Sequence, residues 1–88
     1  MYEKQLEFRG IHREDIVQYL LLLGGNQKNN VLGDFVGEQW EAVVSEESFM
    51  RLFHSDIPVV FVTFTSENEE LCKEVIRKLR LKTFRAGG

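Results

Sequence analysis

The segment 59–65 constrains the fold most, because it reads as a strand that is apolar on both faces. Val60, Val62 and Phe64 would lie on one face, whereas Val59 and Phe61 would lie on the other. A strand of this kind is typical of the centre of a sheet, where both faces are covered. We therefore expect it to be a central strand of the fold.

The chain has 88 residues and one cysteine, which limits how such a sheet can be stabilised. A chain this short buries only about 60–65% of its unfolded surface, and a lone cysteine cannot form an internal disulfide. One domain over residues 1–88, resting on a hydrophobic core, is predicted. The lone cysteine also favours a reducing, cytoplasmic location. We expect neither a signal peptide nor a membrane span, since the longest apolar run is residues 19–23.

A strand and a helix are predicted near the N-terminus. Residues 3–11 alternate between apolar and polar side chains, as in a strand with one buried face. Residues 13–23 follow with apolar spacings near 3.6, and Gly24 can supply a left-handed cap. Because Leu21 and Leu22 lie off the main apolar stripe, we expect this helix to be packed on more than one side.

The middle of the chain predicts a hairpin and one ambiguous segment. Residues 31–36 and 39–45 read as two strands joined by a turn at 37–38. Gly33 within the first would mark a bulge or a close approach by another backbone. Residues 46–56 fit a helix by periodicity, but the segment is short and rich in aromatics, which favours a strand that ends in a turn at 55–56.

A second helix is predicted after the central strand. Ser66 and Glu69 fit a capping box, and an apolar stripe continues for about four turns through Cys72 and Ile76. Residues 81–85 would be a short strand or a tail. Short turns between adjacent strands require antiparallel pairing. The fold class expected is α+β, a two-layer sandwich with a mainly antiparallel sheet of four to five strands and two helices on one face; the alternative is a ferredoxin-like βαββαβ arrangement.

We find no arrangement of residues that points to catalysis, a cofactor or a metal. His12 and His54 have no cysteine or acid at ligand spacing. Cys72 lies on the apolar stripe, where a buried, inert thiol is expected. Glu46 and Glu47 are read as a solvated pair, since adjacency alone does not create a catalytic dyad. The sequence therefore predicts a protein that is not an enzyme.

Charge is unevenly distributed along the chain. The net charge is −3, yet residues 73–88 hold six basic residues and one acid, whereas residues 1–72 hold five basic residues and thirteen acids. The acidic total argues against nucleic acid as the main partner. A basic strip on the last helix could attract an acidic partner, although basic residues at the end of a helix also stabilise its dipole. The candidate strip consists of Lys73, Arg77, Arg80, Lys82 and Arg85.

The chain ends in Gly87-Gly88, the ending that ubiquitin-like sulfur carriers and modifiers present to their activating enzymes. Those carriers open with a hairpin before their helix, whereas here one strand leads directly into a helix. The order of elements and the segment 76–88, which ends Leu-Arg-Leu-Lys-Thr-Phe-Arg-Ala-Gly-Gly, resemble the C-terminal accessory domain of MoaD-related proteins, relatives of the small subunit of molybdopterin synthase. The resemblance implies an accessory module without the sulfur-carrying domain.

The hypothesis from sequence is a non-enzymatic interaction or ligand-binding module that forms a homodimer or joins a larger complex. If both helices cover one face of the sheet, the apolar residues of the other face need a partner. The candidate association face consists of Phe35, Trp40, Val59 and Phe61. The alternative is a sulfur or modifier carrier that uses Gly87 and Gly88.

Overall fold

The segment 59–65, which was predicted to be a central strand, does lie in the middle of the sheet. The computed structural model describes residues 1–28 and 33–87. The elements in these residues are β1 (Tyr2–Arg9), α1 (Arg13–Leu22), β2 (Asn26–Gln27), β3 (Asp34–Gly37), β4 (Trp40–Val44), β5 (Ser48–Leu52), β6 (Ser55–Ser66) and α2 (Glu69–Gly87). All the strand pairs are antiparallel, in the order β1-β6-β4-β3-β2, and β5 also pairs with β6.

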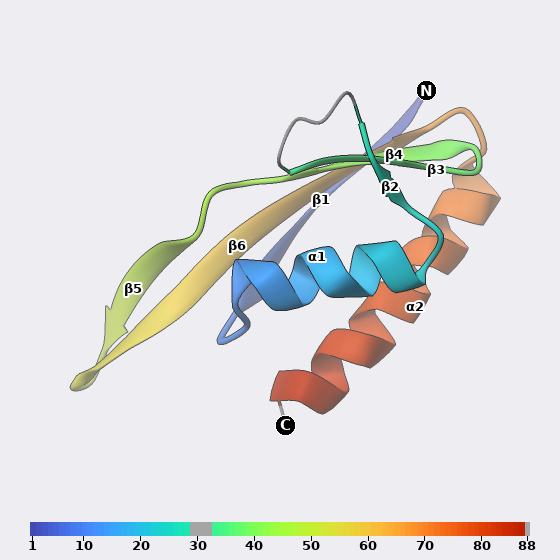
Figure 1. Cartoon of the computed structure of the whole chain (residues 1–88). Helices are drawn as coiled ribbons and strands as arrows, with labels where there is room; N and C mark the ends of the chain where they lie inside the picture. The colour runs from blue at the N-terminus through green and yellow to red at the C-terminus, as the bar shows by residue number, and fades with distance from the viewer. Residues whose placement is uncertain (29–32, 88) are drawn as a thin grey trace.

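Both helices lie on one side of this sheet (Figure 1). The α+β two-layer sandwich is thus confirmed, with six strands in the described residues where four to five were predicted. The ferredoxin-like alternative would end in a strand after the second helix. Helix α2 instead continues to Gly87, so the segment 81–85 is helical and neither a strand nor a tail.

Strand β6 is central because it has neighbours along both edges. It pairs with β1 from Val59 to Ser66, with β4 from Val62 to Thr65, and with β5 from Ser55 to Val59. On its helix-facing side, Val60, Val62 and Phe64 are completely buried. Burial of these three side chains contributes about 1.5–3 kcal/mol each to folding.

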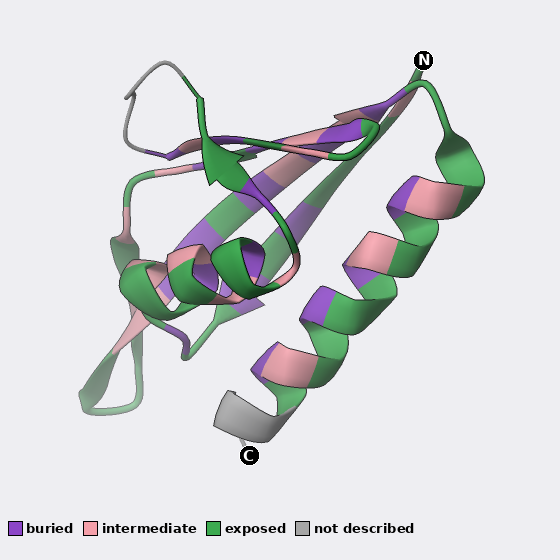
Figure 2. Ribbon diagram, turned by 45° about the vertical axis from the view of Figure 1, so that its right-hand side comes forward, coloured by how far each residue is buried: buried purple, intermediate pink, exposed green. Residues whose placement is uncertain are grey.

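The helices cover the sheet with apolar stripes, visible as the buried bands that face it in Figure 2. Ile16 and Leu20 of α1 and Leu79 of α2 are completely buried in the same core cluster. Leu21 and Leu22, however, are 43% and 71% exposed. Helix α1 does contact α2 as well as the sheet, but Leu21 and Leu22, on which the expectation of a second packed side rested, remain exposed.

The ambiguous segment 46–56 contains a strand, as favoured from the sequence. Strand β5 forms a hairpin with β6 in which Leu52 pairs with Ser55, so the turn is at Phe53 and His54 instead of at 55–56. The hairpin of β3 and β4 is also present, with Gly37 paired to Trp40 and the turn one residue later than predicted. Residues 31–32 of the predicted first strand lie outside the described part.

The N-cap of α2 differs from the predicted capping box. The backbone amide of Leu71 donates to Asn68 Oδ1 at 3.1 Å, so Asn68 caps the helix. Ser66 Oγ accepts from the Asn68 amide at 2.9 Å and donates to the Gln39 carbonyl. Ser66 therefore holds the turn before the helix, and tertiary contact with the β3–β4 turn moved the cap two residues along.

Candidate functional site

A β-bulge between β4 and β5 shapes the first polar cluster. Val44 pairs with Val62, and Ser48 pairs with Val59. Three residues, 45–47, thus lie opposite two, 60–61, which is the signature of a bulge. The Ser45 amide donates to the Phe61 carbonyl at 2.8 Å, and Ser45 Oγ accepts from the Phe61 amide at 2.9 Å. The extra residue turns Glu47 towards the start of α1.

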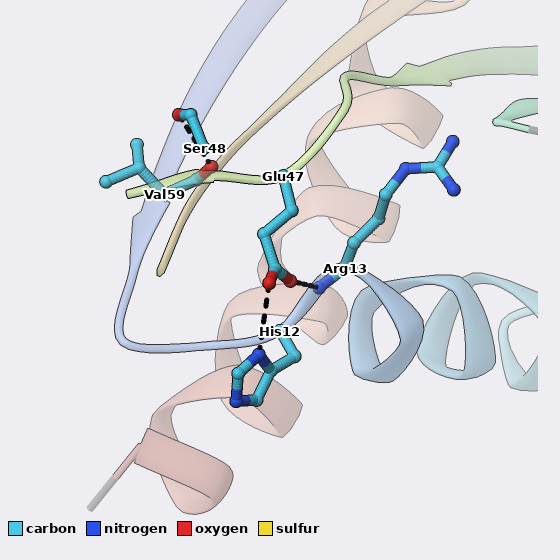
Figure 3. Close-up of polar contacts among 5 residues, drawn as sticks. All are labelled: His12, Arg13, Glu47, Ser48 and Val59. Atoms are coloured by element: carbon cyan, nitrogen blue, oxygen red, sulfur yellow. Dashed lines mark hydrogen bonds and ion pairs between the residues drawn. The ribbon is translucent and has the colours of Figure 1, made fainter. Parts of the chain in front are cut away.

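Glu47 caps α1 from a distant part of the chain (Figure 3). The N-cap residue of this helix, His12, makes no capping bond with its side chain. Glu47 Oε1 instead accepts from the Arg13 amide at 2.7 Å, and Glu47 Oε2 lies 3.3 Å from His12 Nδ1. The Arg13 amide, followed by His12, lowers the pKa of the Glu47 carboxyl below its usual value. The reading of Glu47 as merely solvated was wrong.

The Arg13 side chain completes this cluster and leaves no space for a side chain at Gly33. Arg13 Nε donates to the Ser45 carbonyl at 2.8 Å. Gly33 has a φ of +97°, and a Cβ there would lie 2.5 Å from Arg13 Nη2 and 2.8 Å from the Val44 carbonyl oxygen. The close approach predicted at Gly33 is therefore present. Each polar group of the cluster stabilises the junction of α1 with the bulge, so the cluster is structural.

The predicted basic strip divides between two sides of α2. Lys73 pairs with Glu69 at 2.8 Å, and Arg77 pairs with Glu74. Arg80 lines a shallow groove against β1 that includes Glu7, Phe8 and Arg9. Lys82 lines a different groove, against the end of α1, together with Leu22, Leu23, Lys78 and Leu81. The Arg85 side chain lies outside the described part. The described basic residues thus do not form one continuous surface.

Cys72 is buried in the core between α2 and the sheet. Its exposed fraction is 0%, and burial raises the pKa of its thiol. A thiol of this kind is a poor nucleophile, because the reactive thiolate is disfavoured. Among the described residues, no group of three His, Cys, Asp or Glu side chains is arranged to hold a metal ion.

The structure corrects the expected association face. Phe35 and Trp40 are 2% and 4% exposed and belong to the core under the helices, where the Trp40 ring lies 5.8 Å from that of Phe64. Val59 is also buried, so Phe61 is the only one of the four candidates that is exposed. The reason is register: Phe35 pairs with Ala42, and both side chains point towards the helices.

Three exposed apolar residues lie together on a hairpin whose exposure was not predicted from the sequence. We call residues 48–58 the hairpin arm, because this end of β5 and β6 extends beyond the helices (Figure 1). Residues 55–57 pair only with β5 in the described chain. Phe49, Leu52 and Phe53 of the arm are 61%, 44% and 88% exposed. Three large apolar residues within five positions were the signal available in the sequence.

The family is decided by a comparison that covers almost the whole chain. The model of the archaeal MoaD-like protein family matches residues 4–88. The chain belongs to the archaeal MoaD-like protein family. The resemblance to MoaD-related proteins expected from residues 76–88 is therefore confirmed. A comparison with curated proteins finds no match.

The span of the family match includes the main surface features of this archaeal MoaD-like protein. It takes in the hairpin arm and extends through Gly87 and Gly88. Gly87 is the last residue of α2, and Gly88 lies outside the described residues. No helix in the described chain has the length and apolar character needed to cross a membrane.

Proposed function

We propose that this archaeal MoaD-like protein is a non-enzymatic, cytoplasmic binding module that engages a protein partner through the hairpin arm. The observation that carries the proposal is the exposure of Phe53, 88%, at the tip of the arm. Large aromatic side chains that enter a partner's pocket supply much of the binding energy in protein interfaces. The partner expected is a protein with an apolar recess that accepts Phe53 at the tip of the arm; Phe49 and Leu52 lie on opposite faces of β5, so each would contact a different side of that recess.

The conformation of Phe53 supports this role. Its φ is +57°, a region that bulky residues rarely adopt. Two-residue hairpin turns favour glycine or asparagine at such positions, so a phenylalanine makes the turn less stable than it need be. A two-stranded ribbon is also only marginally stable by itself. Selection for folding alone would not place an exposed phenylalanine here, whereas selection for binding would.

Membership of the MoaD-like family supports a place for this module in molybdopterin-related biochemistry. MoaD-related proteins are relatives of the small subunit of molybdopterin synthase. A module without catalytic residues would act there by holding a protein component of the cofactor machinery. The partner proposed is therefore one of the proteins that handle the cofactor or its sulfur.

The test compares two exposed phenylalanines. The Phe53→Asn variant removes the aromatic side chain but keeps a residue that tolerates positive φ, and Phe84→Asn, on α2, is the matched control because Phe84 is 80% exposed. Partners captured from cell extract and identified by mass spectrometry are then purified and titrated calorimetrically. We expect Phe53→Asn to weaken binding about 30-fold, the effect of losing about 2 kcal/mol, and Phe84→Asn to leave it unchanged. Equal affinities for wild type and Phe53→Asn would refute the proposal.

A second candidate function is a sulfur or modifier carrier that uses the terminal diglycine. The observation that favours it is the family match, which extends to Gly88. Because α2 continues to Gly87, the last turn of the helix would have to unwind before the tail could enter an activating enzyme. Incubation with ATP, a sulfur donor and candidate enzymes that adenylate a C-terminal carboxylate, followed by intact mass measurement, tests this function. A mass that stays unchanged would exclude a carrier role with these enzymes.

A further inference from the structure

Strand β1 forms a long, unpaired edge of the sheet. It has eight residues and pairs only with β6 in the described chain. The opposite edge, β2, has only two residues. Proteins commonly protect sheet edges by making the edge strand short or by placing proline in it. β1 is neither short nor interrupted by proline, but it carries charged side chains, which also protect edges, so it is available only to a strand whose charges complement its own.

The backbone groups that point outwards from β1 can be identified from the ladder. The Gly10 amide donates to the Pro58 carbonyl at 2.9 Å. Hydrogen-bonded pairs alternate along an antiparallel ladder. The backbone amides and carbonyls of Phe8, Leu6, Lys4 and Tyr2 therefore also point towards β6. The amides and carbonyls of the intervening residues therefore face outwards. These residues are Glu3, Gln5, Glu7 and Arg9, and all four are exposed.

We propose that the β1 edge pairs antiparallel with β1 of a second copy of this chain, with Leu6 opposite Leu6 of the partner subunit. In this register Glu3 lies opposite Arg9 of the partner subunit, and Gln5 lies opposite Glu7 of the partner subunit. Opposite charges across a strand pair are favourable, and like charges are unfavourable. The two-fold axis repeats each pair, so one strand is complementary to itself.

Like charges disfavour the two neighbouring registers in which the same outward-facing backbone groups would still meet. A shift of the pairing by two residues in one direction places Glu3 opposite Glu7 of the partner subunit, twice. A shift in the other direction places Glu7 opposite Glu7 of the partner subunit. The pattern Glu-x-Gln-x-Glu-x-Arg therefore selects one register, in which two sheets join into one and both helix layers lie on the same side.

The surface used by this dimer is separate from the hairpin arm. The outward groups of β1 lie on the edge away from β6, whereas β5 pairs with the other edge of β6. Two copies joined through β1 would therefore keep both arms free. The inference thus stands or falls independently of the proposed function.

Sedimentation velocity over a range of concentrations up to about 1 mM tests the dimer, and circular dichroism reports folding of each variant. Wild type should show a concentration-dependent dimer. Gln5→Pro should be monomeric, because its missing amide is one that faces outwards and costs β1 no bond to β6. Phe53→Asn should keep the dimer, which separates this inference from the arm.

A charge exchange tests the register and does not depend on a proline. Arg9→Glu should weaken the dimer at least tenfold, because it places Glu opposite Glu3 of the partner subunit. The double variant Glu3→Arg with Arg9→Glu should restore the dimer, since the pairs are again opposite in charge. A wild-type monomer at all concentrations overturns the inference, as does a dimer that survives in Gln5→Pro or a double variant that remains as weak as Arg9→Glu.

Discussion

The close packing around Gly33 allows the cost of adding one methyl group, in the Gly33→Ala variant, to be predicted as a loss of unfolding free energy. Gly33 and Gly24 have almost the same φ, +97° and +96°. A Cβ at Gly24 would meet no atom within 4 Å, whereas a Cβ at Gly33 would lie 2.5 Å from Arg13 Nη2 and 2.8 Å from the Val44 carbonyl oxygen. The Gly24→Ala variant is thus a matched control that carries the backbone strain without the clash.

The two effects can be given magnitudes. Positive φ costs an alanine about 1–2 kcal/mol, which applies to both variants. At Gly33 the methyl group must also displace the Arg13 side chain, whose Nε donates to the Ser45 carbonyl at 2.8 Å. Loss of such a charged hydrogen bond costs about 1.5–3 kcal/mol. We therefore expect Gly33→Ala to lower the free energy of unfolding by about 2.5–5 kcal/mol and Gly24→Ala to lower it by about 1–2 kcal/mol.

Urea denaturation followed by circular dichroism measures both losses. Repeating Gly33→Ala in an Arg13→Ala background should reduce its cost, because one of the two close contacts is then absent. Equal losses for Gly33→Ala and Gly24→Ala would show that the close approach contributes nothing. An unchanged cost in the Arg13→Ala background would refute the role assigned to the guanidinium.

Three further predictions follow from other contacts. The folded-state pKa of Glu47 is lowered from 4.5, so the stabilisation by its carboxylate is present above pH 4.5 and is lost as the pH falls through the folded pKa. Thermal melts should therefore show that Glu47→Gln loses less stability on acidification than Glu46→Gln, which keeps Glu47. Equal losses in the two variants would contradict this. Asn68→Ala should cost about 1 kcal/mol in urea denaturation through loss of the α2 cap, and no loss would place the cap elsewhere. The buried Cys72 should react with a thiol reagent only as fast as the protein opens; its labelling rate should rise with urea, and rapid labelling of the native protein would be inconsistent with its burial.

The parts of the fold predicted correctly are those encoded in local periodicity. The alternation in β1 and the double-sided apolar pattern of β6 identified both strands, and the 3.6-residue spacing located both helices. The strand in 46–56 was favoured for its aromatics, yet those same aromatics were not recognised as the exposed arm. The face of Phe35 and Trp40 was misassigned because strand alternation defines two faces but does not say which one the helices cover.

The candidate sites depended more strongly on contacts between distant residues. The cap of α1 comes from Glu47, thirty-four positions from the Arg13 amide it accepts from, and no local pattern indicates such a pair. The basic residues of α2 looked continuous in the sequence, but a helix distributes neighbouring residues around its axis, and the structure places Arg80 beside β1 and Lys82 beside α1.

The sequence by itself determined the α+β class, the central position of β6 and the family of the chain, because each follows from local spacing or from residue identity. The tertiary structure alone decided which face of the sheet is covered, that a bulge turns Glu47 onto α1, and that Phe53 projects on an arm beyond the helices. It also decided which backbone groups of β1 face outwards. These features depend on register and on the placement of the helices, which are set by packing among residues far apart in the chain.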